Sequence, residues 1–272
     1  MEEENLILKS WLEQEKIFID NLLISRKRLT RDSVHDLRVA VKKLRSYLRL
    51  KKQLTGEGWK KSFLEITGLF QSFGRVGDFD NALTLIRQAE RRESLLFPFF
   101  KEYLVVNRSL ARKWAKKDAI NFKEEKVEPL GKRLNITMTG AEISEKIIEL
   151  STVKIKKAKQ LSKQFEKNAH KIRKQLKDIY YWIRILPKET GENFIDLKAL
   201  DNMLSYLGSW QDCFVLRNKI KQYLTDLPKQ NKERRSLKMV EKKLVSVQKQ
   251  KLDNAIKKWE KVSIKKADQL VG

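Results

Sequence analysis

Cationic side chains recur at three- and four-residue steps in two distant segments of this sequence. They are His35, Arg38, Lys42, Arg45 and Arg49 in the first segment, and His170, Arg173, Lys177 and Arg184 in the second. Each member of the second set follows its counterpart in the first at the same separation, and the two sets contain both histidines of the chain. Guanidinium, ammonium and imidazole groups donate charge-assisted hydrogen bonds to anionic oxygens. The pattern therefore predicts an anion-binding site, and such binding requires no reaction.

Both cationic sets lie beside an apolar stripe when the segments are drawn as α-helices. At about 100° per residue, the first set spans about 80°, and the neighbouring apolar stripe is centred only about 100° away. A charge run on one helix is more often a solvated surface, but the repeated arrangement favours contact with a ligand. We expect these cations to line a groove or cavity beside the core. The apolar residues are Val34, Leu37, Val41, Leu44 and Leu48, and Ala169, Ile172, Leu176, Ile179 and Ile183.

The composition indicates an intracellular protein that binds a polyanion. The chain has 272 residues, a formal net charge of +25 and a sequence pI near 10.0, so its surface attracts nucleic acid, anionic lipid or another polyanion. Cys213 is the only cysteine, which excludes an intramolecular disulfide and a cysteine-rich zinc site. The amino-terminal segment is acidic, unlike a signal peptide, and no apolar run is long enough to cross a bilayer. We expect a cytoplasmic location.

The scarcity of proline and glycine predicts an all-α fold. The chain has 4 prolines and 10 glycines, and apolar residues recur at helical spacing over long stretches. Breaks are expected at TGEG, SFGRVGD, LPKETGEN and LGSWQD. Asp78 and Asp212 follow glycines in two of these breaks, where we expect each carboxylate to cap the start of a helix. The expected helices cover residues 3–25, 33–53, 59–71, 79–91, 94–123, 141–167, 169–186, 194–206, 213–225 and 229–266.

The order of these expected helices repeats along the chain. Gly74 and Asp78 recur as Gly208 and Asp212, at a separation only one residue shorter than that between the two cationic sets. Because both landmarks recur in the same order, we expect an internal duplication into two equivalent helical bundles. Their boundary is expected between residues 126 and 140, a segment with one proline, two glycines and no helical period. The expected halves are residues 1–132 and 133–272.

The pattern resembles the CHAD family, the conserved histidine α-helical domains that bind inorganic polyphosphate. Each half opens with H-x-x-R-x-x-x-K and continues to an L-G-x-x-x-D-like element, and the likeness covers nearly the whole chain. In the second copy Tyr180 stands where the family usually has a basic residue, and Tyr181 occupies the position of the family's usual tyrosine. In the first copy Gly77 replaces an arginine that commonly precedes the aspartate.

The resemblance implies both an architecture and a ligand. The architecture is two pseudo-symmetric four-helix-bundle halves around a basic central cavity, and the partner is inorganic polyphosphate, bound without catalysis. The implied location is the cytoplasm, in association with polyphosphate granules. The expected polyphosphate-binding residues are His35, Arg38, Lys42, Arg45, Arg49, His170, Arg173, Lys177, Tyr181 and Arg184.

Nonspecific binding of nucleic acid is the main alternative. The segment 154–184 is densely basic and contains Tyr180, Tyr181 and Trp182, whose rings could stack on bases. It contains no recognised nucleic-acid motif, and on the helical wheel Trp182 lies away from the cationic stripe. Competition between polyphosphate and single-stranded nucleic acid discriminates the two functions.

Two further alternatives are weaker. His35 and Asp36 form the HD pair of some metal-dependent phosphohydrolases, but the second histidine lies in the other half, so a metal would have too few ligands. The segment TGEGWKKS lacks the spacing of a phosphate-binding loop. We therefore expect no enzyme activity, metal or cofactor. Anionic membrane binding is disfavoured because no helix is expected to combine a broad exposed apolar face with basic flanks, and no membrane insertion is expected.

Overall fold

The computed structural model describes residues 5–262 and confirms the all-α fold. Ten α-helices and two short 3₁₀-helices form within this range. The α-helices are α1 (Leu6–Lys27), α2 (Arg31–Thr55), α3 (Leu64–Glu93), α4 (Pro98–Asn121), α5 (Glu128–Lys132), α6 (Gly140–Ser162), α7 (Phe165–Ile183), α8 (Lys188–Phe194), α9 (Leu197–Asp226) and α10 (Glu233–Trp259), and the 3₁₀-helices are η1 (Lys61–Phe63) and η2 (Glu124–Lys126).

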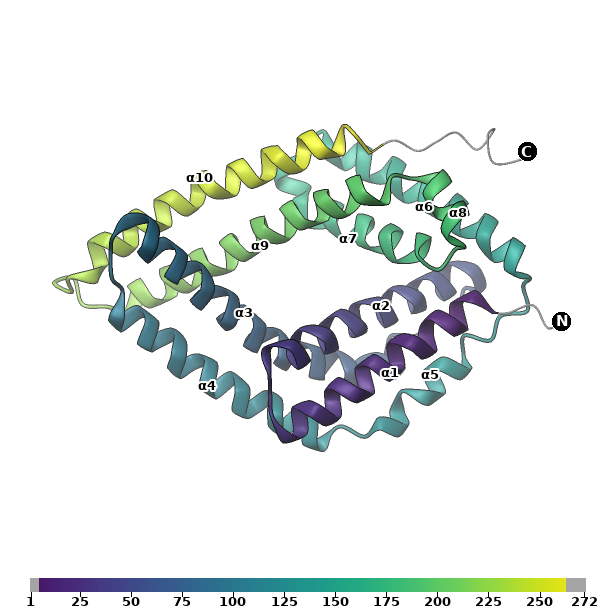
Figure 1. Ribbon diagram of the computed structural model, residues 1–272, viewed down its shortest axis with the longest axis horizontal. Coiled ribbons are helices and arrows are strands. Elements are labelled where there is room, and N and C mark those ends of the chain that lie inside the picture. Colours follow the sequence, from purple (N-terminus) through teal and green to yellow (C-terminus); the bar gives the residue numbers. More distant parts are fainter. Residues whose placement is uncertain (1–4, 263–272) are drawn as a thin grey trace.

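The long helices pack in consecutive pairs. α1 packs on α2 and α3 on α4, and in the same way α6 packs on α7 and α9 on α10. Within each group the pairs are joined by α2 with α3 and by α7 with α9. Contacts between α2 and α7, and between α3 and α9, join the two groups (Figure 1). The helices that carry the cationic sets, α2 and α7, therefore lie against each other.

Two of the expected helix breaks are absent, so the capping role expected for two aspartates is wrong. α3 runs without interruption through SFGRVGD and α9 through LGSWQD, which places Asp78 and Asp212 in helix interiors. Glycine inside a helix costs only about 1 kcal/mol relative to alanine, and tertiary packing outweighs that cost here. Phe73 and Val76 of α3 and Leu207 of α9 are fully buried.

The other expected boundaries agree to within a few residues, with two exceptions. The segment LPKETGEN, expected as a break, contains the short helix α8. The expected boundary segment 126–140 contains α5, whose proline lies in the first turn, where proline is tolerated. The break at TGEG is confirmed, because Gly56 ends α2 in the left-handed conformation with φ 76°. The expected helix ends at residues 3 and 266 lie outside the described residues.

A buried carboxylate fixes α2 against α7. Asp178 of α7 is only 2% exposed, and its Oδ1 accepts hydrogen bonds from Arg49 Nε (3.0 Å) and Ser46 Oγ (3.0 Å) of α2. Lys154 of α6 adds an ion pair of 3.3 Å to Oδ2. The indole Nε1 of Trp182 donates to the backbone oxygen of Ser46 at 3.0 Å. These directional bonds set the register of the two helices.

A second junction ties α10 to the start of α4. Glu233 of α10 is buried, and its two carboxylate oxygens accept hydrogen bonds from the backbone N–H groups of Phe99 (2.9 Å) and Phe100 (3.0 Å). These are among the first N–H groups of α4, which have no partner inside their own helix. The same two helices also share an apolar cluster with α3 and α9, and this cluster includes Ile86 and Leu216.

Candidate anion-binding site

Four cations from α2 and α7 gather at one place. Arg38 and Lys42 come from α2, and Arg173 and Lys177 come from α7. Burial, followed by the charges of Arg38 and Arg173, lowers the pKa of Lys42 to about 8. Burial, followed by the charges of Lys42, Arg173 and Arg38, lowers the pKa of Lys177 to about 7. Cations that are far apart in the sequence thus lie within one another's electric field.

The apolar stripes explain why these cations cannot point away from each other. Leu37 and Val41 of α2, and Ile172 and Leu176 of α7, are fully buried. Burying a large aliphatic side chain is worth about 1.5–3 kcal/mol, so the apolar stripes fix the rotation of both helices. The cationic stripes, which border them, are then held at the edge of the core.

Each arginine of the cluster has an unused hydrogen-bond donor. The Nε atoms of Arg38 and Arg173 are buried and have no hydrogen-bond partner among residues 5–262. Most buried polar groups in proteins are paired, and a buried donor without a partner is costly. The same atom is also unpaired in Arg108 and Arg217, so it is the position of Arg38 and Arg173 beside Lys42 and Lys177 that favours an anionic oxygen as the missing partner.

Carboxylates from α3 and α9 partly neutralise the cluster. Asp78 Oδ1 of α3 lies 3.6 Å from Arg38 Nη2, and Asp212 Oδ1 of α9 accepts a hydrogen bond of 3.2 Å from Asn81 Nδ2. Burial raises the pKa of Asp78, Arg38 acts in the opposite direction, and Asp212 adds to the increase. Asp212 also acts on Lys42, since its charge raises the pKa of that lysine. Asp201 of α9 lines the same pocket as Lys177 and raises the pKa of that lysine, so four cations face three carboxylates, which leaves a positive excess.

Gly77 makes room for the Arg38 guanidinium. A Cβ atom at this position would lie 1.8 Å from Arg38 Nη1, which is far inside contact distance. On α9, a Cβ atom at Gly208 would lie 3.8 Å from Arg173 Nη2, an ordinary contact. The glycine that departs from the CHAD pattern is thus the one that allows Arg38 to lie directly against α3.

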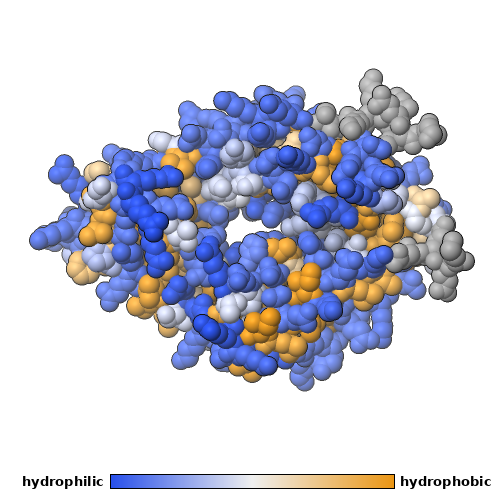
Figure 2. Space-filling model, viewed as in Figure 1, coloured by the Kyte–Doolittle hydropathy of each residue, from blue (hydrophilic) through white to orange (hydrophobic). Residues whose placement is uncertain are grey.

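A pocket of about 430 Å³ opens beside the cluster. Arg173 and Lys177 form one wall with Tyr181, and Gly208 and Asp212 of α9 form another. Burial raises the pKa of Tyr181 to about 12, so its hydroxyl remains protonated and can donate a hydrogen bond near neutral pH. The face of the molecule drawn in Figure 2 is hollowed near its middle and mostly hydrophilic around the hollow.

The remaining cations of the α2 stripe have protein partners. The Arg45 guanidinium carbon lies 4.8 Å from the ring centre of Phe70 and 5.6 Å from that of Phe63. Arg49 is bound to Asp178. Both arginines line a different pocket of about 500 Å³. This pocket is also lined by Lys52, Lys154, Lys174 and Trp182.

The outermost expected site residues are exposed. His35 and His170 lie near the starts of α2 and α7, and neither imidazole has a hydrogen bond or an ion pair among residues 5–262. Arg184 follows α7 and donates a hydrogen bond of 2.7 Å to the hydroxyl of Tyr180. Its charge is one of the causes that lower the pKa of Lys43. The structure therefore places these three residues outside the buried cluster.

Sequence reasoning missed two charged groups near the expected site. Lys154 of α6 contacts Asp178, and Lys219 of α9 lies 3.3 Å from the ring centre of Phe79. The charge of Lys219 lowers the pKa of Asp78. Neither lysine belongs to a repeated pattern, so no spacing signal marks it. Asp78 and Asp212 did carry such a signal, since their separation matches that of the cationic sets within one residue.

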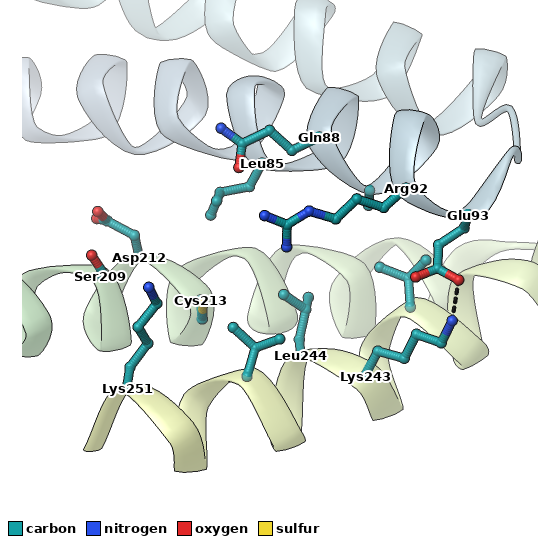
Figure 3. A pocket seen from close by; sticks show the side chains of 13 residues that line it. Leu85, Gln88, Arg92, Glu93, Ser209, Asp212, Cys213, Lys243, Leu244 and Lys251 are labelled. Carbon is teal, nitrogen blue, oxygen red and sulfur yellow. Dashed lines mark hydrogen bonds and ion pairs between the residues drawn. The ribbon is translucent and has the colours of Figure 1, made fainter. Parts of the chain in front are cut away.

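A further pocket of about 330 Å³ lies between α3, α9 and α10 (Figure 3). Arg92 extends into it from α3 above apolar side chains such as Leu244, and Lys251 stands near Asp212 at one end. Ser209 and Asp212 line both this pocket and the cationic one. The two spaces therefore adjoin along α9, one lined by charged and polar side chains of both signs and the other with an apolar floor.

Comparison with known proteins identifies the fold. The CHAD domain matches residues 18–221. The chain belongs to the CHAD domain family. The CHAD domain from the plant Ricinus communis has a similar crystal structure, with a TM-score of 0.70, 18% sequence identity, and coverage of 94% of this chain and 90% of that one. No curated protein matches the sequence.

A second solved structure has the same fold as this CHAD protein. PptA from Streptomyces chartreusis aligns with a TM-score of 0.68 at 13% identity, covering 95% of this chain and 98% of that one. Both likenesses concern the fold. No helix within residues 5–262 is long and apolar enough to cross a membrane, and these residues contain no group of three metal-binding side chains.

Proposed function

We propose that this CHAD protein binds inorganic polyphosphate, without catalysis, in one basic cavity shared by residues 1–132 and 133–272. The observation that carries the proposal is the convergence of Arg38 and Lys42 with Arg173 and Lys177. Four cations held within one another's field repel each other unless an anion lies between them. Polyphosphate supplies about one negative charge per phosphate along a flexible chain, so several cations can share a single ligand.

The cluster forms the centre of the proposed site. Arg38 and Arg173 each offer a buried Nε donor without a partner among residues 5–262, and the protonated hydroxyl of Tyr181 stands beside them. Arg45 and Arg49 extend the path along α2, and the exposed His35, His170 and Arg184 contact the polymer where it leaves the cavity. The pocket of about 500 Å³ has a mainly cationic lining, and the pocket of about 430 Å³ holds Arg173 and Lys177 opposite Asp201 and Asp212, so the two spaces are consistent with a long ligand.

A shared cavity also accounts for selectivity for a polymer over single phosphate ions. Orthophosphate can contact only part of the cluster, whereas linked phosphates bind further cations at high effective concentration. The carboxylates of Asp78 and Asp212 disfavour weakly bound anions, because an entering anion must overcome their repulsion.

Titration of labelled long-chain polyphosphate at two salt concentrations tests the proposal. Binding should weaken steeply with salt because counterions are released from the polymer, and orthophosphate should compete poorly. Absence of detectable association at low salt would refute the proposal. Stoichiometry with a short oligophosphate tests the shared cavity, since one cavity binds one oligomer and two independent sites bind two.

Nonspecific nucleic-acid binding remains the rival, but the aromatic residues of the basic segment do not support it. Trp182 and Tyr181 are buried and present little ring surface to a base. Tyr180 is half-buried and accepts the hydrogen bond from Arg184. In competition, polyphosphate should displace single-stranded nucleic acid at a far lower phosphate concentration. The reverse order would favour the rival.

A further inference from the structure

The outer face of α4 carries an apolar stripe that no part of the described chain covers. Phe99 and Trp114 are each 57% exposed, and Val106 and Leu110 are each 52% exposed. Ile120 near the end of the helix is also 57% exposed. At about 100° per residue these five side chains lie on the side of the helix opposite its buried residues. The buried residues are Phe100, Leu104, Ala111, Ala115 and Ala119.

This stripe is an unusual surface for a strongly charged protein. Single exposed apolar residues are normal, but a contiguous exposed group marks an interaction site. α4 packs on α3 and α1 through its other side and lies at the edge of the molecule (Figure 1). Figure 2 shows hydrophobic groups along the lower left edge, where Figure 1 places α4. From Phe99 to Ile120 the stripe extends over about 32 Å.

Lysines lie within the same face. On the helical wheel, Lys113 and Lys117 fall among the exposed apolar residues, and Lys116 lies beside them. Lys117 Nζ stands 5.7 Å from the ring centre of Trp114. Glu102 lies at the border of the stripe, and Asp118 lies outside it. The last three turns of the outer face therefore combine apolar and cationic groups without a carboxylate.

We propose that the outer face of α4 binds an anionic lipid surface. Phe99, Leu110 and Trp114 enter the boundary between headgroups and acyl chains, and Lys113 and Lys117 contact the headgroup phosphates. Helices that lie in the plane of a membrane combine these features, and tryptophan is favoured at this depth. Long lysine stems can lie along the apolar surface while their ammonium groups reach the phosphates. No helix with a broad exposed apolar face was expected from the sequence, whereas α4 exposes Phe99, Leu110 and Trp114.

Charge complementarity favours a lipid surface over a second copy of this chain. In a twofold pairing centred on the last three turns of α4, Lys113 and Lys117 would approach the same residues of the other copy, and no carboxylate lies in that part of the stripe to neutralise them. Desolvating like charges together is unfavourable. An anionic surface supplies the missing negative charge.

Vesicle co-sedimentation tests the apolar part of the proposal. The protein should bind phosphatidylglycerol vesicles and fail to bind vesicles of phosphatidylcholine alone. The double variant Leu110→Ser with Trp114→Ser should lose about tenfold or more in affinity, because both side chains leave water on binding. The matched control is Val153→Ser with Val245→Ser, whose side chains are 57% and 45% exposed on α6 and α10. This control should retain binding, and all four positions are exposed enough to leave thermal unfolding nearly unchanged.

Charge reversal distinguishes binding through the outer face of α4 from nonspecific attraction between the positively charged protein and anionic vesicles. Lys113→Glu with Lys117→Glu should weaken vesicle binding far more than Lys238→Glu with Lys242→Glu, an exposed pair of equal spacing on α10. Equal losses from the two lysine pairs, or unchanged binding by the Leu110 and Trp114 variant, would overturn the proposal in favour of diffuse attraction. Analytical ultracentrifugation tests the other occupant. If the parent protein is a dimer that binds no vesicles, and the Leu110 and Trp114 variant is a monomer, the face binds a second copy of the chain instead.

Discussion

The two ends of the cationic stripe on α2 differ in their neighbours. Arg38 and Lys42, in the first half of the helix, lie among other cations, and the nearby carboxylates neutralise them only in part. Arg45 and Arg49, further along the helix, are satisfied by aromatic rings and by Asp178. A continuous stripe in the sequence thus divides into cations at the centre of the proposed site and cations further along the path that also hold the fold. The distinction depends on what the neighbouring helices bring to each position.

The largest expected effect comes from reversing charge at the first end of the stripe. Arg38→Glu with Lys42→Glu should weaken polyphosphate binding by about 100-fold or more, because two charge-assisted hydrogen bonds of about 1.5–3 kcal/mol each are replaced by repulsion. The control is Lys116→Glu with Lys117→Glu on exposed positions of α4, which changes the net charge equally and should cost less than about tenfold. Fluorescence titration measures both. Equal losses in folded variants would indicate a diffuse field.

Removing the carboxylate of Asp178, which holds Arg49 further along α2, should lower the stability of the fold and leave polyphosphate binding nearly unchanged. Asp178→Asn leaves the charges of Arg49 and Lys154 without their buried partner, so the free energy of unfolding should fall by about 3 kcal/mol. Urea denaturation measures this change, with the exposed Asp253→Asn on α10 as the control. The folded variant should bind polyphosphate within a few-fold of the parent. If the Asp178→Asn protein were as stable as the parent but bound polyphosphate much more weakly, Arg49 would act mainly in ligand binding and not in holding α2 against α7.

The comparison also shows which parts of the site could be predicted from the sequence. The stripe on α2 was predictable because helical periodicity is local, and the constant separation between matching cations identified its counterpart on α7. The partner of Arg49 could not be predicted in the same way. At that separation Asp178 corresponds to Lys43, so the carboxylate belongs to no repeated pattern, and only the packing of α7 on α2 brings it to Arg49.

Because the pKa values of Lys42 and Lys177 are lowered, polyphosphate binding should depend on pH. Lys177 and Lys42, with pKa values of about 7 and 8, are partly neutral in the free protein slightly above neutral pH. A bound anion favours the ammonium form, so binding should take up protons, and affinity should fall about tenfold as the pH rises from about 7 to about 9. Calorimetry in buffers of different ionisation enthalpy measures the uptake. Lys42→Arg with Lys177→Arg should reduce it, and identical uptake in this variant would exclude the two lysines as the source.

The stability of the free protein should have the opposite dependence on pH. Both folded pKa values lie below the ordinary value of 10.5, so the unfolded chain holds more protons in the window between the folded and ordinary values. Stability rises with pH wherever the unfolded state binds more protons, so these two lysines should make the free protein more stable as pH increases through this window. Saturating polyphosphate should diminish this rise.

The glycines of SFGRVGD and LGSWQD were expected to break helices, whereas in α3 and α9 they lie inside continuous helices. Gly74, Gly77 and Gly208 all lie inside continuous helices with ordinary backbone angles, since Gly56 is the only glycine with a positive φ among the described residues. Local propensity could not reveal this, because the reason for Gly77 lies on another helix. It accommodates Arg38, whose guanidinium approaches the α3 backbone.

The smallest expected effect follows from this close approach and separates it from helix propensity. Gly77→Ala would place a methyl group 1.8 Å from the present position of Arg38 Nη1, so the flexible guanidinium must move away, and polyphosphate affinity should fall several-fold. Gly208→Ala meets Arg173 Nη2 at an ordinary 3.8 Å and should leave affinity unchanged. Both alanines gain up to about 1 kcal/mol in helix propensity, so neither variant should unfold. Titration of the two variants side by side decides the point: equal affinities would mean that the position of Arg38 against α3 is not required for binding.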